Sequence, residues 1–242
     1  MSAARNRPAA NRLLEVLPRG ERANLLGNCE RVDLVLSDIL CEPDKPIRHA
    51  YFPTVGFISL LTPVDGHTSL EVGLIGDEGM LGVGMVLGVQ ASPLQGLVQG
   101  SGNAYRISAP LFSRELRRSP GLKAMLNRYA YVAMSQIALS AACNRYHVVA
   151  GRLARWLLMT ADRAHAESFV ITHEFLAHML GVRRAGVTRA ASALRRRRLI
   201  RYSRGHITIL DRPALEAASC SCYSVSKELH RRTTLPSRRR RV

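Results

Sequence analysis

The stretch from Thr172 to Leu210 places the strongest constraint on how this chain can fold. It begins with THEFLAHMLG, in which Thr172 can cap a helix and apolar side chains recur at helical spacing up to Gly181. The next segment, VRRAGVTRAASAL, has the same periodicity, and the residues beyond it alternate around a central glycine as in a β-hairpin. We therefore expect two short helices joined by a tight turn and followed by a hairpin.

The second of these helices has one small apolar face and one polar face, because residues three and four apart are neighbours on a helix. The apolar positions are Val187, Ala190, Ala191 and Leu194. The opposite face carries Arg184, Ala185, Thr188, Arg189 and Ser192. Arginine can donate two hydrogen bonds to a guanine edge, and threonine or serine can contact bases or phosphates. The pattern favours a recognition helix for the DNA major groove, with a solvated basic helix of another domain as the alternative.

The net charge of +17 is confined to one half of the 242-residue chain. Residues 1–120 contain 12 Lys and Arg against 12 Asp and Glu, so this half is neutral. Of the totals of 35 basic and 18 acidic residues, the remaining 23 and 6 lie in residues 121–242. Such segregation indicates a polyanion-binding half joined to a neutral half.

Membrane binding is the competing explanation for a basic half. The first residues, MSAARNRPAANR, lack the apolar core of a signal peptide. The longest run of apolar residues and glycine, Met80–Val89, is far shorter than the roughly 20 residues of a spanning helix. The basic runs Arg195–Arg198 and Arg238–Arg241 have no apolar anchor beside them. We expect no membrane partner and a cytoplasmic location, which the five irregularly spaced cysteines also suit.

Between Arg31 and Ile107, short apolar runs alternate with glycine, proline and other turn residues. This texture predicts an antiparallel sandwich or barrel, with a hairpin turn at Asp65–Gly66. The segment Met80–Gly88 fits either a short helix or a loop. Upstream, two short helices are expected within residues 11–29.

A long helix is expected from Gly121 to Arg145, because proline at 120 suits a first helical turn and none follows. Its widest apolar stripe consists of Leu122, Leu126, Tyr129, Ala133, Gln136, Ser140 and Cys143. So wide a stripe must bury against more than one surface: we expect one side to cover the β domain and the other to pair with the same helix of a second chain. Burial entirely within one chain is the alternative. Asn144–His147 is the expected hinge to a further helix, and residues 224–242 are expected to be a disordered basic tail.

Several patterns resemble catalytic or metal motifs without fitting them. His173 and His178 are five residues apart, about 140° around a helix, and so cannot bind one zinc ion as in H-E-x-x-H. The glycines at 82, 84 and 88 have the wrong spacing for a dinucleotide loop. No catalytic triad, phosphate-binding loop or carboxylate pair stands out, so we expect neither an enzyme nor a cofactor.

The cysteines also give no metal site by spacing. Cys220 and Cys222 are close enough to share a metal or to react with an oxidant, but a closed zinc site needs four ligands. Cys29 and Cys41 belong to no motif, and Cys143 is expected to be a small buried apolar residue. We therefore expect no metal, and a redox role for Cys220 and Cys222 is the alternative.

A β-rich first half, a long helix, a hinge and a winged helix–turn–helix in this order resemble the Crp/Fnr family of bacterial transcription regulators. The resemblance is strongest in GRLARWLL (Gly151–Leu158) and in Thr172–Leu210, and weaker across the β half. It implies an α+β fold: an antiparallel β-roll (a jelly-roll like cyclic-nucleotide-binding domains), a dimerisation helix and a winged helix–turn–helix. It also implies a homodimer that binds double-stranded DNA and acts with RNA polymerase.

In that family an Arg-Glu pair and a further arginine read bases, and the residue that opens the preceding helix meets phosphate. These positions correspond here to Arg184, Ala185, Arg189 and Thr172. The glutamate position is alanine, so the resemblance implies DNA binding but a different half-site. The full set expected at DNA is Thr172, Arg183, Arg184, Thr188, Arg189, Ser192, Arg201 and Arg204.

The family's cyclic-nucleotide pocket uses an acid after a glycine for the ribose and an arginine for the phosphate. Asp77 or Glu78 after Gly76 would supply the acid, and they are the candidate effector pocket. Between Gly76 and Tyr105 there is no lysine or arginine, so a buried cyclic phosphate would lack a charge partner. We expect that cyclic AMP does not bind in the usual way, and the effector is unknown.

The expected domains are an arm and short helix (1–24), the β-roll (25–119), the dimerisation helix and hinge (120–147), the DNA-binding domain (148–223) and the tail (224–242). The expected function is sequence-specific regulation of transcription. Two alternatives remain from the sequence: a non-specific nucleic-acid-binding protein, and a ligand or redox sensor whose output is a protein partner.

Overall fold

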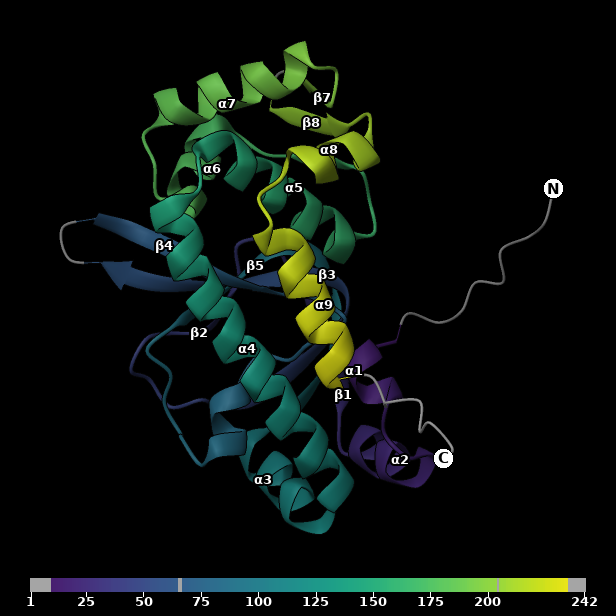
Figure 1. Ribbon diagram of the computed structural model, residues 1–242. Coiled ribbons are helices and arrows are strands. Elements are labelled where there is room, and N and C mark those ends of the chain that lie inside the picture. Colours follow the sequence, from purple (N-terminus) through teal and green to yellow (C-terminus); the bar gives the residue numbers. More distant parts are fainter. Residues whose placement is uncertain (1–9, 65–66, 204, 235–242) are drawn as a thin grey trace, which may run out of the picture.

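A computed structural model describes residues 10–64, 67–203 and 205–234. Figure 1 shows a β-rich half and a helical half, with the long helix α4 (Pro120–Tyr146) running beside both. The predicted α+β fold class is confirmed. The expected turn at Asp65–Gly66, the basic arm up to residue 9, Arg204 and residues 235–242 lie outside the described residues.

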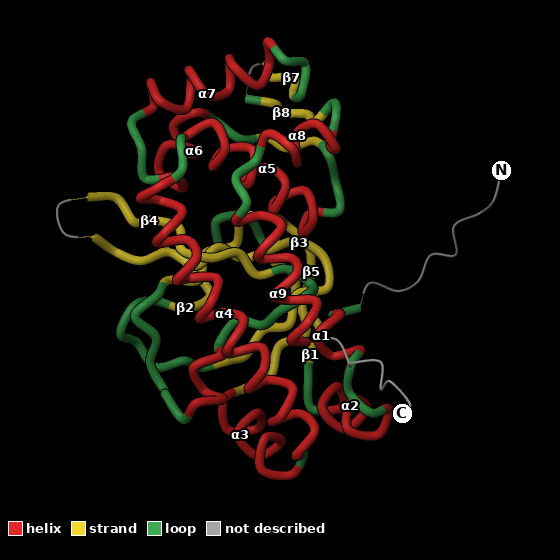
Figure 2. Tube along the Cα trace, viewed as in Figure 1, coloured by secondary structure: helices red, strands yellow, loops and turns green. Residues whose placement is uncertain are grey.

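The β-rich half is built on a five-stranded antiparallel sheet in the order β1-β5-β3-β4, with β2 also paired to β5. Its strands are β1 (Glu30–Leu34), β2 (Ile39–Cys41), β3 (His49–Val64), β4 (His67–Ile75) and β5 (Gln95–Ser108). The register between the two longest strands, β3 and β5, shifts three times between Pro53 and Ile58. Such irregularities bend a strand pair, and Figure 2 shows the resulting curved sheet in yellow.

Helices close the lower end of this sheet in the view of Figure 1. They are α1 (Arg12–Glu15), α2 (Arg19–Gly27), the 3-10 helix η1 (Val83–Leu87) and α3 (Ala109–Arg118). Phe52 of β3 and Phe112 of α3 meet edge to face at 6.2 Å in the core beneath them, and both are fully buried. The ambiguous segment Met80–Gly88 is thus a short helix.

Helix α4 confirms the long helix expected from the sequence. Ser119 caps it by accepting the Leu122 N–H at 3.1 Å, and proline occupies the first turn. Four of the side chains assigned to a dimer seam point into their own chain instead: Leu122, Leu126, Tyr129 and Cys143 are at most 6% exposed. That assignment was wrong because α4 has a second apolar stripe, and periodicity does not tell which stripe faces the core.

The exposed stripe of α4 includes Tyr131, Met134 and Ile137, which are 53%, 63% and 37% exposed. Of the remaining members of the expected stripe, Ser140 is also buried, and Ala133 and Gln136 are half-buried. Among the helices that the structure describes, none has the length and apolar character needed to cross a bilayer.

The helical half begins at α5 (Val149–Ala164). Only Val148 separates it from His147, the cap of α4, where the sequence predicted a break. It continues with β6 (Ser168–Val170), α6 (His173–Leu180), α7 (Arg184–Arg196), β7 (Ile200–Ser203), β8 (His206–Ile209) and α8 (Arg212–Ala218). The strands form a small antiparallel sheet in the order β6-β8-β7. Leu153 and Leu157 of α5 are fully buried beneath α6 and α7. The predicted hairpin is confirmed, and β6 adds a strand that the sequence did not indicate.

The C-terminal segment corrects the prediction of a disordered tail. Cys222–Thr234 forms α9, which lies along α4 with its first turn near the end of that helix (Figure 1). Tyr223, Ser226 and Thr234 are buried, so one face of α9 packs on the protein. High polar content concealed this helix, since its apolar contacts are few and widely spaced.

Candidate nucleic-acid interface

The turn between α6 and α7 follows from two local residues. The Thr172 hydroxyl accepts the Phe175 N–H at 3.1 Å and begins α6, as the sequence predicted. Gly181 ends α6 with a φ of +59°, a conformation that favours glycine. A Cβ at Gly181 would also lie 2.7 Å from Leu70 Cδ1 of β4, so the turn contacts the β-rich half closely.

Helix α7 divides into the two faces expected from its sequence. Its inner residues Val187, Ala190, Ala191 and Leu194 are all at most 5% exposed. Because Val187, Ala190 and Ala191 are small, α7 can lie close to α5. This packing buries the inner face of α7 and leaves its outer face uncovered. The outer residues Arg183, Arg184, Ala185, Thr188 and Arg189 are exposed, and Ser192 is half-buried.

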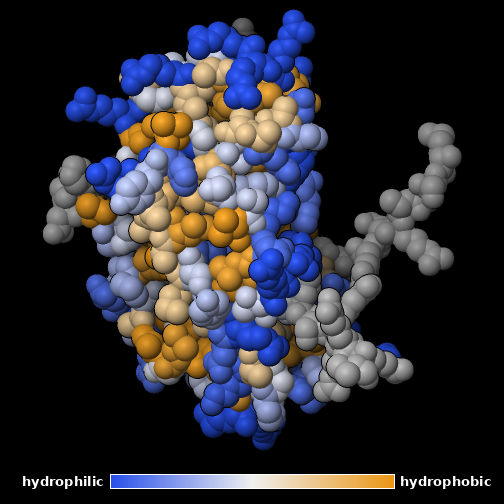
Figure 3. All heavy atoms as spheres, in the orientation of Figure 1, coloured by the Kyte–Doolittle hydropathy of each residue, from blue (hydrophilic) through white to orange (hydrophobic). Residues whose placement is uncertain are grey.

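The basic surface extends past the end of α7. Arg195–Arg198 and Arg201 of β7 are exposed, and they extend the surface formed by the exposed arginines of α7. Within the described part of the chain, none of these arginines forms an ion pair with a carboxylate. Figure 3 shows the hydrophilic atoms gathered over this end of the molecule. An uncompensated basic surface of this kind attracts phosphates.

Two residues that sequence reasoning missed support this face. The His173 ring of α6 stacks on Tyr202 of β7 with centroids 4.3 Å apart and planes 11° apart. Its Nδ1 lies 3.1 Å from the Thr188 hydroxyl, which donates to the Arg184 carbonyl at 3.1 Å. Thr188 therefore braces α7 against α6 and the hairpin. No local pattern could have linked His173 to Tyr202, because the contact depends on how the hairpin folds back.

The surroundings of His173 favour its neutral form. Burial lowers its pKa below the ordinary value, and the neighbouring Arg184 charge lowers it further. A neutral ring stacks on Tyr202 without adding charge to the face, and its Nδ1–H can donate to Thr188.

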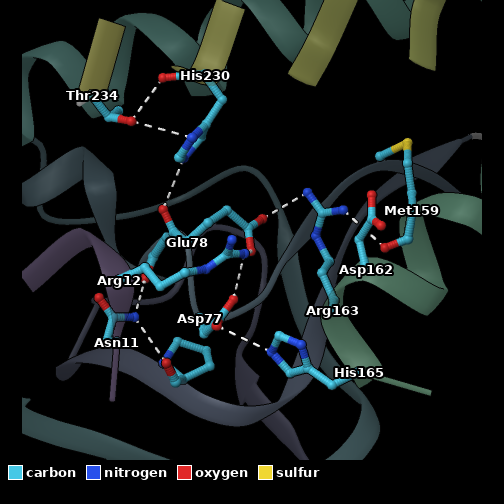
Figure 4. A network of polar contacts seen from close by, with 12 residues as sticks. Asn11, Arg12, Asp77, Glu78, Met159, Asp162, Arg163, His165, His230 and Thr234 are labelled. Carbon is cyan, nitrogen blue, oxygen red and sulfur yellow. Dashed lines mark hydrogen bonds and ion pairs between the residues drawn. The ribbon is translucent and has the colours of Figure 1, made fainter. Parts of the chain in front are cut away.

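The two acids of the candidate effector pocket are used by their own chain. Asp77 accepts from Arg12 at 2.7 Å and lies 3.1 Å from His165 Nε2, and Glu78 pairs with Arg163 at 2.7 Å (Figure 4). Burial opposes ionisation of Glu78, but Arg163 and other partners outweigh it and leave its pKa below the ordinary value. Arg12 of α1 and Arg163 of α5 thus neutralise the two acids within the chain, and a role for Asp77 or Glu78 in binding an effector stays a prediction.

These pairs join the two halves of the molecule. Arg163 belongs to α5, whereas Glu78 follows β4. The Glu78 carbonyl also accepts a hydrogen bond from His230 Nε2 of α9 at 3.1 Å (Figure 4). A cavity of about 820 Å³ adjoins these pairs and is lined by residues of α1, α5 and α9. Glu78, Arg163 and His230 are among its lining residues.

Residues 151–218 match the family model of the Crp-like helix-turn-helix domain. The whole fold is similar to solved structures of transcription regulators. One is a putative regulator of the Crp/Fnr family from Eubacterium rectale, at TM-score 0.66 and 18% identity, covering 86% of this chain and 97% of that one.

A second similar structure is FixK2 from Bradyrhizobium japonicum, at TM-score 0.67 and 12% identity over 79% of this chain and 98% of that one. A third is TTHA1359, a Crp/Fnr-family transcriptional regulator from Thermus thermophilus, at TM-score 0.62 and 19% identity over 78% and 98% of the two chains. The sequence matches no curated protein.

Proposed function

We propose that this protein is a sequence-specific, homodimeric regulator of transcription that binds double-stranded DNA in the cytoplasm. The proposal starts from its Crp-like helix-turn-helix domain and its similarity in fold to Crp/Fnr regulators. The observation that carries the proposal is the outer face of α7. It presents Arg183, Arg184 and Arg189 on a well-packed support, and none of the three pairs with an acid among the described residues. A helix of this kind fits the major groove of DNA.

Base reading is assigned to the first two turns of α7. Arg184 and Arg189 lie five positions apart on the exposed face and supply bidentate donors for guanine. Ala185 between them offers no acceptor to a cytosine amine, so the half-site differs from one read by an Arg-Glu pair. Thr172 and Arg201, at the edges of the face, would contact the DNA backbone.

Dimerisation is assigned to the exposed stripe of α4. Tyr131, Met134 and Ala138 follow the three-four repeat by which two helices pack, and Ala141 continues it. Two chains joined there would present two copies of α7 to successive major grooves, about 34 Å apart on a near-palindromic site. RNA polymerase is the expected partner of the DNA-bound dimer.

Binding of cyclic AMP in the usual way is not part of the proposal. The segment from Gly76 to Tyr105 supplies no cation for a cyclic phosphate, and Arg163 already pairs with Glu78 at 2.7 Å. We expect isothermal titration with cyclic AMP to give no heat of binding at micromolar concentrations. Phosphate-dependent micromolar binding would contradict this expectation.

Selection of bound DNA from random sequence, with the purified full-length chain, tests the function. The expected result is a motif with two inverted half-sites whose centres lie one helical turn apart. Recovery of sequences with no common motif, together with equal affinity for random duplexes, would instead support non-specific binding. Failure to retain any DNA at low salt would reject a nucleic-acid function.

A further inference from the structure

Four side chains that can bind metals meet where α4, α5 and α9 come together. Cys143 and His147 lie one turn apart at the end of α4, while Cys220 lies between α8 and α9 and Cys222 begins α9. Their ligand atoms all lie within 4.8 Å of one another. The sequence expectation of no metal site counted only Cys220 and Cys222, and the fold adds the two ligands that were lacking.

The spacing of these atoms suits a tetrahedral ion. Cys143 Sγ and Cys220 Sγ are 3.5 Å apart, and Cys222 Sγ lies 3.5 Å from His147 Nδ1. A tetrahedral zinc ion with Zn–S bonds of about 2.3 Å places its sulfur ligands about 3.8 Å apart, and a nitrogen ligand slightly closer. These two separations are within a few tenths of an ångström of that geometry, and the remaining pairs of ligand atoms lie within 4.8 Å of one another.

The three cysteines of the cluster are buried. Cys143, Cys220 and Cys222 are 0%, 9% and 3% exposed, and His147 is half-buried. Four protein ligands in a covered position are typical of a structural zinc site, whereas a catalytic site keeps one position open. We propose that Cys143, His147, Cys220 and Cys222 bind one Zn²⁺ ion per chain in a Cys₃His site.

The surroundings suit the charge of such a site. Three thiolates and Zn²⁺ carry a net charge of −1, and two arginines of α5 are near enough to interact with it. Arg155 donates to the Ser140 hydroxyl at 3.2 Å, one turn before Cys143, and Arg152 donates to Asn144 at 2.7 Å. These bonds fix the end of α4 from which two ligands project.

Metal binding would join three parts of the fold at the hinge. His147 caps α4 directly before α5, and the Cys220 N–H donates to the Gly151 carbonyl in the first turn of α5 at 3.3 Å. An ion held by these residues fixes α9 and the α4–α5 connection together. The proposed site therefore sets the position of the DNA-binding half relative to α4.

The test is the metal content of the full-length protein purified under reducing conditions without chelator. Elemental analysis is expected to find one zinc ion per chain, retained on dialysis. Replacement by Co²⁺ is expected to give a thiolate-to-cobalt charge-transfer band and the strong visible bands of tetrahedral cobalt. Substoichiometric metal together with no thiolate–cobalt band would overturn the proposal.

Variants locate the ion. Cys222→Ser and His147→Ala are expected to lower zinc retention and to change the cobalt spectrum, whereas Cys29→Ser and Cys41→Ser, which alter free cysteines elsewhere, leave both unchanged. The wild-type cobalt spectrum keeps the proposal testable if a variant fails to fold. Rapid formation of a Cys143–Cys220 disulfide in a protein that binds neither metal would show a redox pair instead.

Discussion

The single tryptophan of the chain, Trp156 in α5, donates its indole N–H to Glu71 of β4 at 2.8 Å. Ser59 of β3 donates to the other oxygen of the same carboxylate at 2.7 Å. Burial raises the pKa of Glu71 to about 7, although both hydrogen bonds oppose that shift. A carboxyl group that titrates near neutral pH thus lies between the β-rich half and the DNA-binding half.

We expect Glu71 to make the stability of the protein depend on pH between about 5 and 7. The folded state binds its proton up to about pH 7, whereas the unfolded state releases it near the ordinary glutamate pKa. The contribution of Glu71 to stability therefore falls as pH rises through this window, by at most about 3 kcal/mol. Denaturant unfolding of the wild type and Glu71→Gln across pH 5–8 measures the difference.

Trp156 fluorescence provides a second measurement of the same group. The wild-type emission should change with a midpoint near pH 7, and Glu71→Gln should abolish that change. A midpoint that persists in Glu71→Gln would assign the titration to another group.

The buried pair of Glu78 and Arg163 predicts a strong asymmetry between single and double substitutions. Arg163→Ala leaves the Glu78 carboxylate buried without its 2.7 Å partner, which should cost about 3–5 kcal/mol of stability at neutral pH. The combination Arg163→Met with Glu78→Gln removes both charges and should retain most of the stability. Since the pKa of Glu78 is lowered, the contribution of the pair is present above the ordinary glutamate pKa and is lost as pH falls through the lowered value.

Thermal and denaturant unfolding of these variants measure the effect. Equal stability of Arg163→Ala and the double variant would mean that the cost comes from lost packing of the arginine stem rather than from the unpaired carboxylate.

Substitution of Arg184 separates base reading from general attraction to DNA. Arg184→Ala should cost about 1–3 kcal/mol on the selected site and relax specificity at one position in each half-site. Arg201→Ala should instead weaken binding to all sequences to a similar degree, as expected for a phosphate contact. Fluorescence anisotropy with the selected site, its single-position variants and a random duplex measures both.

Arg117 provides the matched control for charge. It is an exposed arginine at the end of α3, at the opposite end of the molecule from α7 (Figure 1). Arg117→Ala removes the same charge and should leave affinity and specificity unchanged. Equal losses on specific and random DNA for Arg184→Ala would reject its role in reading bases.

The DNA-binding half could be predicted because its signals are local. Thr172, Gly181 and the four inner residues of α7 each act within a few positions of the chain. The cysteine cluster could not, because Cys143 and Cys220 are separated by 77 positions and meet only when α9 folds back on α4. The partners of Asp77 and Glu78 were hidden for the same reason, since Arg12 and Arg163 come from other elements.

The proposed dimer surface shows a different limit of sequence reasoning. Helix α4 carries apolar side chains on two faces, and the wider stripe around Leu126 proved to be the core. Met134 belongs to the other stripe and is 63% exposed. Met134→Glu should place like charges opposite each other in a paired helix and convert the dimer to a monomer, while the single-chain fold stays intact. Light scattering after size exclusion and circular dichroism measure the two properties.

Leu36→Glu is the control for this substitution, because Leu36 is similarly exposed, at 59%, but lies in the turn after β1. It should leave the dimer unchanged. Loss of the dimer in Met134→Glu should also weaken binding to a two-half-site duplex far more than binding to a single half-site, since one chain then reads only one groove. A dimer that survives in Met134→Glu would reject the exposed stripe of α4 as the seam.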